Sequence, residues 1–176
     1  GRLPFEEAEW RQKTRRKRIM AMLGKEIRMS RLVNPVSNKM MAITVDHATS
    51  RGIAPMTGIQ DVQSAIDKII LGKPDAMTMT KGIAERCMYQ HAGKVSILMK
   101  ISNYSPVAPT KDTIFGTVDE AIRMGADAVS MGCMTLGDFQ GEQFEAIGRV
   151  AEECMRKGMP LIGHVYPKGA SVPADK

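Results

Sequence analysis

The sequence predicts an α/β protein built around a parallel sheet, and three observations support this prediction. Short apolar runs bounded by turn residues alternate five times with segments of helical periodicity. Ionisable residues stand directly after several of these runs, where parallel strands present functional groups at their carboxyl ends. The 176 residues are enough for one domain with a substantial core.

Strands and helices alternate in the order that this fold class requires. The predicted strands are short apolar runs that cover residues 40–45, 76–80, 95–101, 128–131 and 161–165. The segments between them carry apolar residues at helical spacing, and the predicted helices cover residues 59–71, 83–91, 117–124 and 139–157. Thr117 and Glu120 form a capping-box pattern at the start of the third of these helices.

The N-terminal segment, residues 1–24, is expected to form a basic helical extension with Gly24 as its C-cap, followed by a short helix over residues 25–32. Nine Lys or Arg residues fall between Arg11 and Arg31, and they supply most of the net charge of +6. Such a block can bind nucleic acid or an anionic surface. A solvated helix face or a contact in a homo-oligomer is the favoured interpretation, because no aromatic-rich nucleic-acid motif accompanies it.

The composition argues against several classes of protein. No run reaches the length of a membrane span, so no membrane partner is expected. The three cysteines are far apart and form no CxxC pair, which disfavours both a disulfide framework and a zinc site. We therefore expect a cytoplasmic protein without a bound metal or other cofactor. The 15 methionines are attributed to core packing.

Two architectures fit the alternating pattern: an open doubly wound sheet and a (β/α)₈ barrel that has been cut short. No G-x-G-x-x-G or P-loop follows the first predicted strand, which leaves the nucleotide-binding open sheets without support. A full barrel needs on the order of 250 residues. The chain starts without methionine and stops inside a predicted βα loop, so a fragment is expected.

The order of motifs at the strand ends favours the barrel. The motifs occupy residues 40–52, 79–83, 117–130, 158–162 and 166–169. Together they resemble the class I, Schiff-base aldolases of the archaeal fructose-bisphosphate aldolase group, which includes 2-amino-3,7-dideoxy-D-threo-hept-6-ulosonate synthase and the autoinducer-2 thiolase. The resemblance implies a truncated (β/α)₈ TIM barrel over residues 25–176, holding strands one to five of eight. It also implies a lyase that acts on a phosphorylated keto-sugar through a lysine on strand six, beyond this sequence.

The resemblance also implies roles for two residues. Asp46 matches the family's strand-one aspartate, which shuttles protons at the reacting carbons, and Tyr166 matches the tyrosine that serves as general acid or base. The sequence departs from the family at Ala48, which replaces a glycine, at residues 102–105, which replace a glycine-rich loop, and at Lys168, which replaces an arginine. The first two departures are expected to alter the choice of substrate.

Four further residues are candidates for substrate binding because they lie at or near predicted strand ends: His47, Lys81, Lys100 and His164. Each has a plainer alternative, since His47 could serve a loop and His164 the core. Lys81 or Lys100 could instead be the Schiff-base lysine of a complete small enzyme. Two other functions stay open: a synthase or thiolase of the same family, and a non-enzymatic module that binds through the basic block.

Overall fold

The computed structural model describes residues 22–51, 56–170 and 172, and its centre is a five-stranded parallel sheet. The strands are β1 (Ala42–Thr44), β2 (Ala76–Thr80), β3 (Ser96–Lys100), β6 (Ala128–Thr135) and β7 (Leu161–Pro167). They lie in the order β1-β2-β3-β6-β7, so each pairs with the next barrel strand along the chain. A doubly wound sheet would reverse its strand order part-way. The prediction of a truncated barrel is therefore confirmed.

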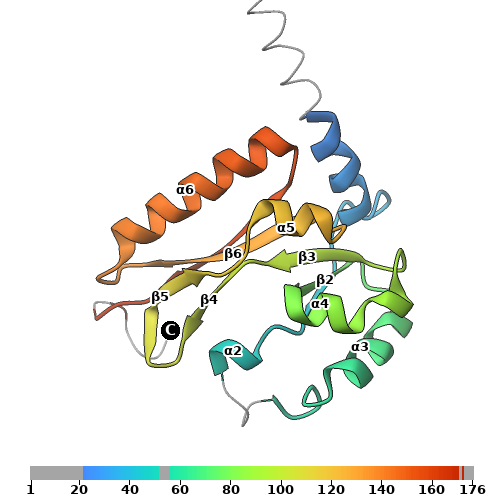
Figure 1. The fold of residues 1–176 in the computed structure, drawn as a ribbon, viewed down its shortest axis with the longest axis horizontal. Coiled ribbons are helices and arrows are strands. Elements are labelled where there is room, and N and C mark those ends of the chain that lie inside the picture. The colour runs from blue at the N-terminus through green and yellow to red at the C-terminus, as the bar shows by residue number, and fades with distance from the viewer. Residues whose placement is uncertain (1–21, 52–55, 171, 173–176) are drawn as a thin grey trace, which may run out of the picture.

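The helices cover the outer face of this sheet (Figure 1). They are α3 (Val62–Leu71), α4 (Lys81–Cys87), the 3₁₀ turn η2 (Tyr89–His91), α5 (Val118–Arg123) and α6 (Gln140–Lys157). α3 begins later than predicted because Asp61 caps it, accepting a hydrogen bond from the Ser64 amide. The capping box of Thr117 and Glu120 is confirmed at α5. Among the described residues, no helix is both long and apolar enough to cross a membrane.

The two faces of the sheet contribute to two separate apolar clusters, because side chains alternate along each strand. Met77, Met79 and Met131 are buried on the helix side, which confirms that much of the methionine content fills the core. On the inner face, Ala76, Leu98 and Ala128 of the sheet form a smaller cluster with Leu32, which lies outside the sheet. The small residues Ala76 and Ala128 suit this position, because the inner face of a barrel has little room near its axis.

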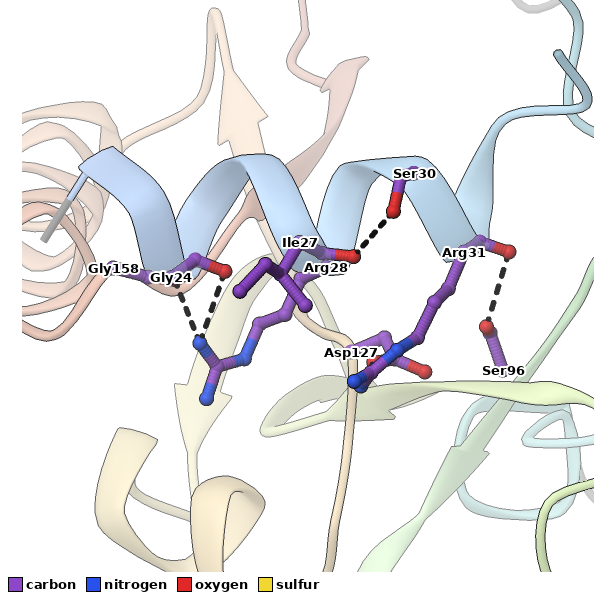
Figure 2. Close-up of polar contacts among 8 residues, drawn as sticks. All are labelled: Gly24, Ile27, Arg28, Ser30, Arg31, Ser96, Asp127 and Gly158. Carbon is purple, nitrogen blue, oxygen red and sulfur yellow. Dashed lines mark hydrogen bonds and ion pairs between the residues drawn. The ribbon is translucent and has the colours of Figure 1, made fainter.

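A helix over residues 22–32 covers the inner cluster at the amino ends of the strands (Figure 1). Arg28 donates to the carbonyl of Gly158 at 3.1 Å, and Arg31 pairs with Asp127 at 2.9 Å (Figure 2). This helix runs without a break through Gly24, so the predicted C-cap at Gly24 and the separate short helix over residues 25–32 are wrong. The arginines supply the physical reason, since they tie this helix to Gly158 and Asp127, just before the amino ends of β7 and β6. The rest of the predicted basic extension, residues 1–21, lies outside the described residues.

An antiparallel hairpin at the carboxyl end of β3 was missed by the sequence prediction. Strands β4 (Ser102–Ser105) and β5 (Ala108–Ile114) form a separate two-stranded sheet, where a loop was expected. In Figure 1 this hairpin and helix 22–32 lie at opposite ends of the barrel strands. The loop predicted after residue 47 also contains a short helix, α2 (Ala48–Arg51), and β6 and β7 extend further than predicted.

Candidate active site

A cavity of about 170 Å³ lies at the carboxyl ends of the barrel strands, beneath the hairpin. Five of the six predicted site residues line it: Asp46, His47, Lys100, His164 and Tyr166. The sheet brings them together from β1, β3 and β7, which are far apart in the sequence. The sequence-based prediction that strand ends would gather these groups therefore holds for these five, while their roles stay predictions.

Strand register explains why these side chains point the same way. Lys100 pairs with Ser130 of β6, and His164 pairs with Gly132 two residues further along β6. Positions two apart on a strand share a face, so Ser130 and Gly132, like His164 and Tyr166, lie on the inner side. A hydrogen bond of 2.8 Å joins Ser130 Oγ and His164 Nε2 and fixes the imidazole.

Lys100 is the most buried of the predicted site residues, with 6% of its surface exposed. Its ammonium group has neither a hydrogen bond nor an ion pair within 4.0 Å to another described residue, although it lines the cavity. Burial lowers the pKa of Lys100, while the negative charges of Asp112 and Asp46 act in the opposite direction. A desolvated lysine without a partner costs free energy and is typical of a functional site.

The two histidines differ in their surroundings. Burial lowers the pKa of His164, the charge of Lys100 lowers it further, and Asp46 opposes both effects. The neutral imidazole is therefore favoured, and it can pass a proton to or from Ser130 or a bound ligand. The Nδ1 atom of His47 is buried without a partner among the described residues. The carbonyl of His47 accepts a hydrogen bond from the Ser50 amide at 3.1 Å, which shapes the start of α2.

Asp112 is a cavity residue that the sequence analysis missed. It lies on β5, opposite Tyr104, and only 7% of its surface is exposed. Burial raises its pKa, while Ser102 and the charge of Lys100 act in the opposite direction. Its Oδ1 atom is buried and has no hydrogen-bond partner in the described part of the chain. The signal that could have found it is the β-branched content of the segment, since Thr110, Thr113 and Ile114 surround the aspartate and favour a strand there.

The hairpin forms one wall of the cavity and contacts both α2 and the segment that follows β7. Asn103 donates a hydrogen bond to Thr49 of α2, and the ammonium of Lys168 lies 4.1 Å from the centre of the Tyr104 ring. Such a cation–π contact contributes about 0.5 to 1 kcal/mol at a partly exposed position. The three sequence departures, at Ala48, residues 102–105 and Lys168, thus meet around one opening.

Lys81, the sixth predicted residue, does not line the cavity. It begins α4, and its Nζ atom donates to Glu120 Oε1 of α5 at 2.8 Å. The described residues also contain no group of three or more His, Cys, Asp or Glu side chains that could hold a metal ion. The groups that line the cavity are proton carriers and hydrogen-bond donors, which suits chemistry at a carbonyl or hydroxyl carbon.

Comparison with known proteins identifies the family. The sequence model of the DeoC/LacD family aldolases matches residues 40–176. The chain belongs to this aldolase family. A 2-amino-3,7-dideoxy-D-threo-hept-6-ulosonate synthase of Archaeoglobus fulgidus is 30% identical over 151 residues, which cover 85% of this chain and 56% of that protein. The class 1 fructose-bisphosphate aldolase of Thermoproteus tenax is 26% identical, over 76% of this chain and 52% of that protein.

Solved structures support the same fold. A Schiff-base-forming fructose-1,6-bisphosphate aldolase superposes with a TM-score of 0.74 at 21% identity, covering 85% of this chain and 60% of that one. An archaeal fructose 1,6-bisphosphate aldolase superposes with a TM-score of 0.69 at 24% identity, with the same coverage of both chains. The chain spans about half the length of the curated relatives it matches, since it covers 56% of the synthase and 52% of the class 1 aldolase.

Proposed function

We propose that this chain forms the first five strands of a class I aldolase-type lyase that acts on a phosphorylated keto-sugar through a lysine Schiff base. The observation that carries the proposal is the convergence of Asp46 and Tyr166 on one cavity at the carboxyl ends of the strands. Aldol cleavage needs an electron sink, which an iminium supplies, and a base for the proton of the departing hydroxyl group. The proposed enzyme works in the cytoplasm as a homo-oligomer.

The proposed roles follow from the position of each group. Tyr166 takes and returns the hydroxyl proton as the carbon–carbon bond breaks or forms, and Asp46 moves protons at the carbon next to the iminium. His47, Lys100 and His164 contact oxygen atoms of the sugar. The Schiff-base lysine comes from strand six, which would pair with β7. Lys81 is the weakest candidate for substrate contact, because it pairs with Glu120 outside the cavity.

A synthase of the same family is the second candidate. The relatives named as 2-amino-3,7-dideoxy-D-threo-hept-6-ulosonate synthases in Archaeoglobus fulgidus and Halobacterium salinarum are 30% and 28% identical to this chain. The aldolase of Thermoproteus tenax is 26% identical. Both activities would use the same lysine and differ in the molecule that accepts the carbon fragment.

The test is retro-aldol turnover of fructose 1,6-bisphosphate together with borohydride trapping of the imine, read by mass spectrometry. We expect neither turnover nor trapping with the 176-residue chain. With a protein extended through the remaining strands, we expect trapping on a lysine beyond residue 176. Robust trapping on Lys81 or Lys100 would overturn this assignment. Release of glyceraldehyde 3-phosphate favours the aldolase, whereas turnover only with a second carbonyl acceptor favours the synthase.

The catalytic assignment is tested in the extended protein with Tyr166→Phe. Loss of a general acid or base should lower kcat about 10²- to 10⁴-fold while imine trapping persists. Tyr89→Phe is the matched control, because Tyr89 is 84% exposed and lies outside the cavity. Equal rates in the two variants would remove Tyr166 from the mechanism.

A further inference from the structure

The hairpin β4–β5 brings to the cavity a carboxyl group, that of Asp112, which the family resemblance did not indicate. Asp112 lines the cavity together with Lys100, and both side chains are almost fully buried. Burial disfavours the charged form of both groups. Against this effect, Asp112 raises the pKa of Lys100, and Lys100 lowers the pKa of Asp112. In a poorly solvated site such a pair interacts far more strongly than it would in water.

The backbone around Asp112 is built to hold it there. Gln143 of α6 accepts a hydrogen bond from the Asp112 amide at 3.3 Å and donates one to its carbonyl at 3.1 Å. Gln143 is itself 4% exposed, so this clamp is inside the protein. The hairpin therefore cannot shift at Asp112 without breaking two buried hydrogen bonds.

Gly132 of β6 makes room for the carboxyl group. A Cβ atom at this position would lie 1.8 Å from Asp112 Oδ2 and 2.7 Å from its Cγ. No real side chain tolerates these distances, so the carboxyl group occupies the space that a side chain would fill. The Gly132 amide in turn donates to Ser102 Oγ at 2.9 Å, at the base of the hairpin.

We propose that Asp112 is a positioning residue that keeps Lys100 in its charged ammonium form, so that Lys100 donates to an oxyanion or hydroxyl oxygen of the substrate. The charged form cannot attack a carbonyl group, because the nitrogen has no lone pair. With Asp112 beside it, Lys100 therefore binds the substrate, and a different lysine forms the imine. The inference rests on the proposed function of the cavity.

The other charged and titratable groups around Lys100 are consistent with this role. Its register partners Thr80 and Ser130 carry no charge. Asp46 adds a second negative charge that favours the ammonium form. Cys133 follows Gly132 on β6, and burial together with the charge of Asp112 raises the pKa of its thiol, so that it stays neutral. The remaining titratable side chains that line the cavity are His47, Tyr104, His164, Tyr166 and Lys168.

The test measures the titration of individual lysines in the 176-residue chain without substrate. Acetic anhydride acetylates only the neutral amine, so the labelling rate of each lysine against pH, read by mass spectrometry, gives its pKa. In Asp112→Asn we expect the pKa of Lys100 to fall by about one unit or more, which raises its labelling about tenfold at a pH below its midpoint. Lys81 and Lys94, which lie outside the cavity, serve as internal references and should keep their profiles.

The matched control is Asp138→Asn, which removes one charge from an exposed position near the same end of the sheet. An unchanged Lys100 profile in Asp112→Asn, or an equal change in Asp138→Asn, overturns the proposal. If Asp112→Asn does not fold, Lys100→Met tests the same coupling, because the Asp112 carboxyl, followed by carbon-13 NMR, should then titrate at a higher pH. No change there also overturns the proposal. Failure of aldolase activity in an extended protein is a separate outcome, since these titrations need no catalysis.

Discussion

Lys100 is the last residue of β3 and Lys81 directly follows the neighbouring parallel strand β2, yet the structure gives the two lysines opposite surroundings. Lys81 has 41% of its side chain exposed and pairs with Glu120 at 2.8 Å, between α4 and α5. Lys100 is 6% exposed and lies in the cavity with no hydrogen-bond partner in the described residues. A lysine at a strand end is therefore not a site residue by position alone, and the face on which it lies decides its role.

Strand register accounts for the difference. Thr80, the last residue of β2, is the partner of Lys100 across the sheet. Side chains alternate along a strand, so Thr80 and Lys100 share the inner face while Lys81, one residue later, points toward the helices. A shift of one residue thus turns a cavity lysine into a surface lysine.

The largest expected effect is a difference in enzyme activity between variants of the two lysines, measured in a protein extended through all strands of the barrel. Lys100→Met removes a charged donor to the substrate, a bond that contributes about 1.5 to 3 kcal/mol, so kcat/KM should fall roughly 10- to 100-fold. Lys81→Met should stay within about twofold, because exposed ion pairs contribute little. The measurement is retro-aldol turnover at saturating and at low substrate. A larger loss in Lys81→Met than in Lys100→Met would reverse the comparison.

Much of the sheet could be predicted from the sequence, because apolar runs and helical periodicity are local. β2 was predicted with its observed limits, Ala76–Thr80, and the capping box fixed the start of α5. Gly24 was misjudged because a glycine near basic residues resembles a helix end. What keeps the helix intact is its contact with the sheet, including the bond from Arg28 to Gly158, 130 residues away. Such a contact has no local signature.

Only those residues of the cavity that lie at the ends of barrel strands could be predicted from the sequence. Asp46, His47, Lys100, His164 and Tyr166 follow or end predicted strands, and the parallel sheet gathers them. Asp112 was missed because it reaches the cavity through a hairpin, whose pairing depends on contacts across the turn and not on periodicity. Lys81 was included because it directly follows the predicted strand 76–80, and the prediction used position at a strand end and not the face on which the side chain lies.

A second comparison replaces a glycine by alanine, which should disturb the surroundings of Lys100 and leave those of Lys81 unchanged. Gly132→Ala places a methyl group where Asp112 Oδ2 lies, so the buried carboxyl must move, at a cost of about 1 to 3 kcal/mol in the free energy of unfolding. Gly148→Ala is the control, because nothing lies within 4 Å of the added carbon in α6. That variant should be more stable by about 0.5 to 1 kcal/mol.

Chemical denaturation gives both free energies, and lysine acetylation shows where the disturbance reaches. In Gly132→Ala the labelling profile of Lys100 should change while that of Lys81 stays constant. If Gly132→Ala is as stable as the wild type and its Lys100 profile is unchanged, the carboxyl of Asp112 does not occupy the space opposite Gly132.

The smallest expected effect concerns the partner of Lys81. The bond from Lys81 lowers the pKa of Glu120 most, and the bond from the Thr117 amide lowers it next. Lys81→Met should therefore raise the pKa of the Glu120 carboxyl toward its ordinary value, but part of the lowering should remain because the Thr117 amide still donates at 2.9 Å. Carbon-13 NMR of the carboxyl group measures this shift directly.

The sign of the pH dependence follows from the same contact. A carboxyl whose pKa is lower in the folded than in the unfolded chain stabilises the folded state above its unfolded pKa, and this contribution is lost as the pH falls through the folded pKa. The difference in stability between wild type and Lys81→Met should thus be largest near neutral pH and vanish in acid. Lys94→Met is the control, since Lys94 is exposed and makes no ion pair with a described residue. A difference that persists unchanged in acid would mean that Lys81 acts through its packing against α4 and not through its charge.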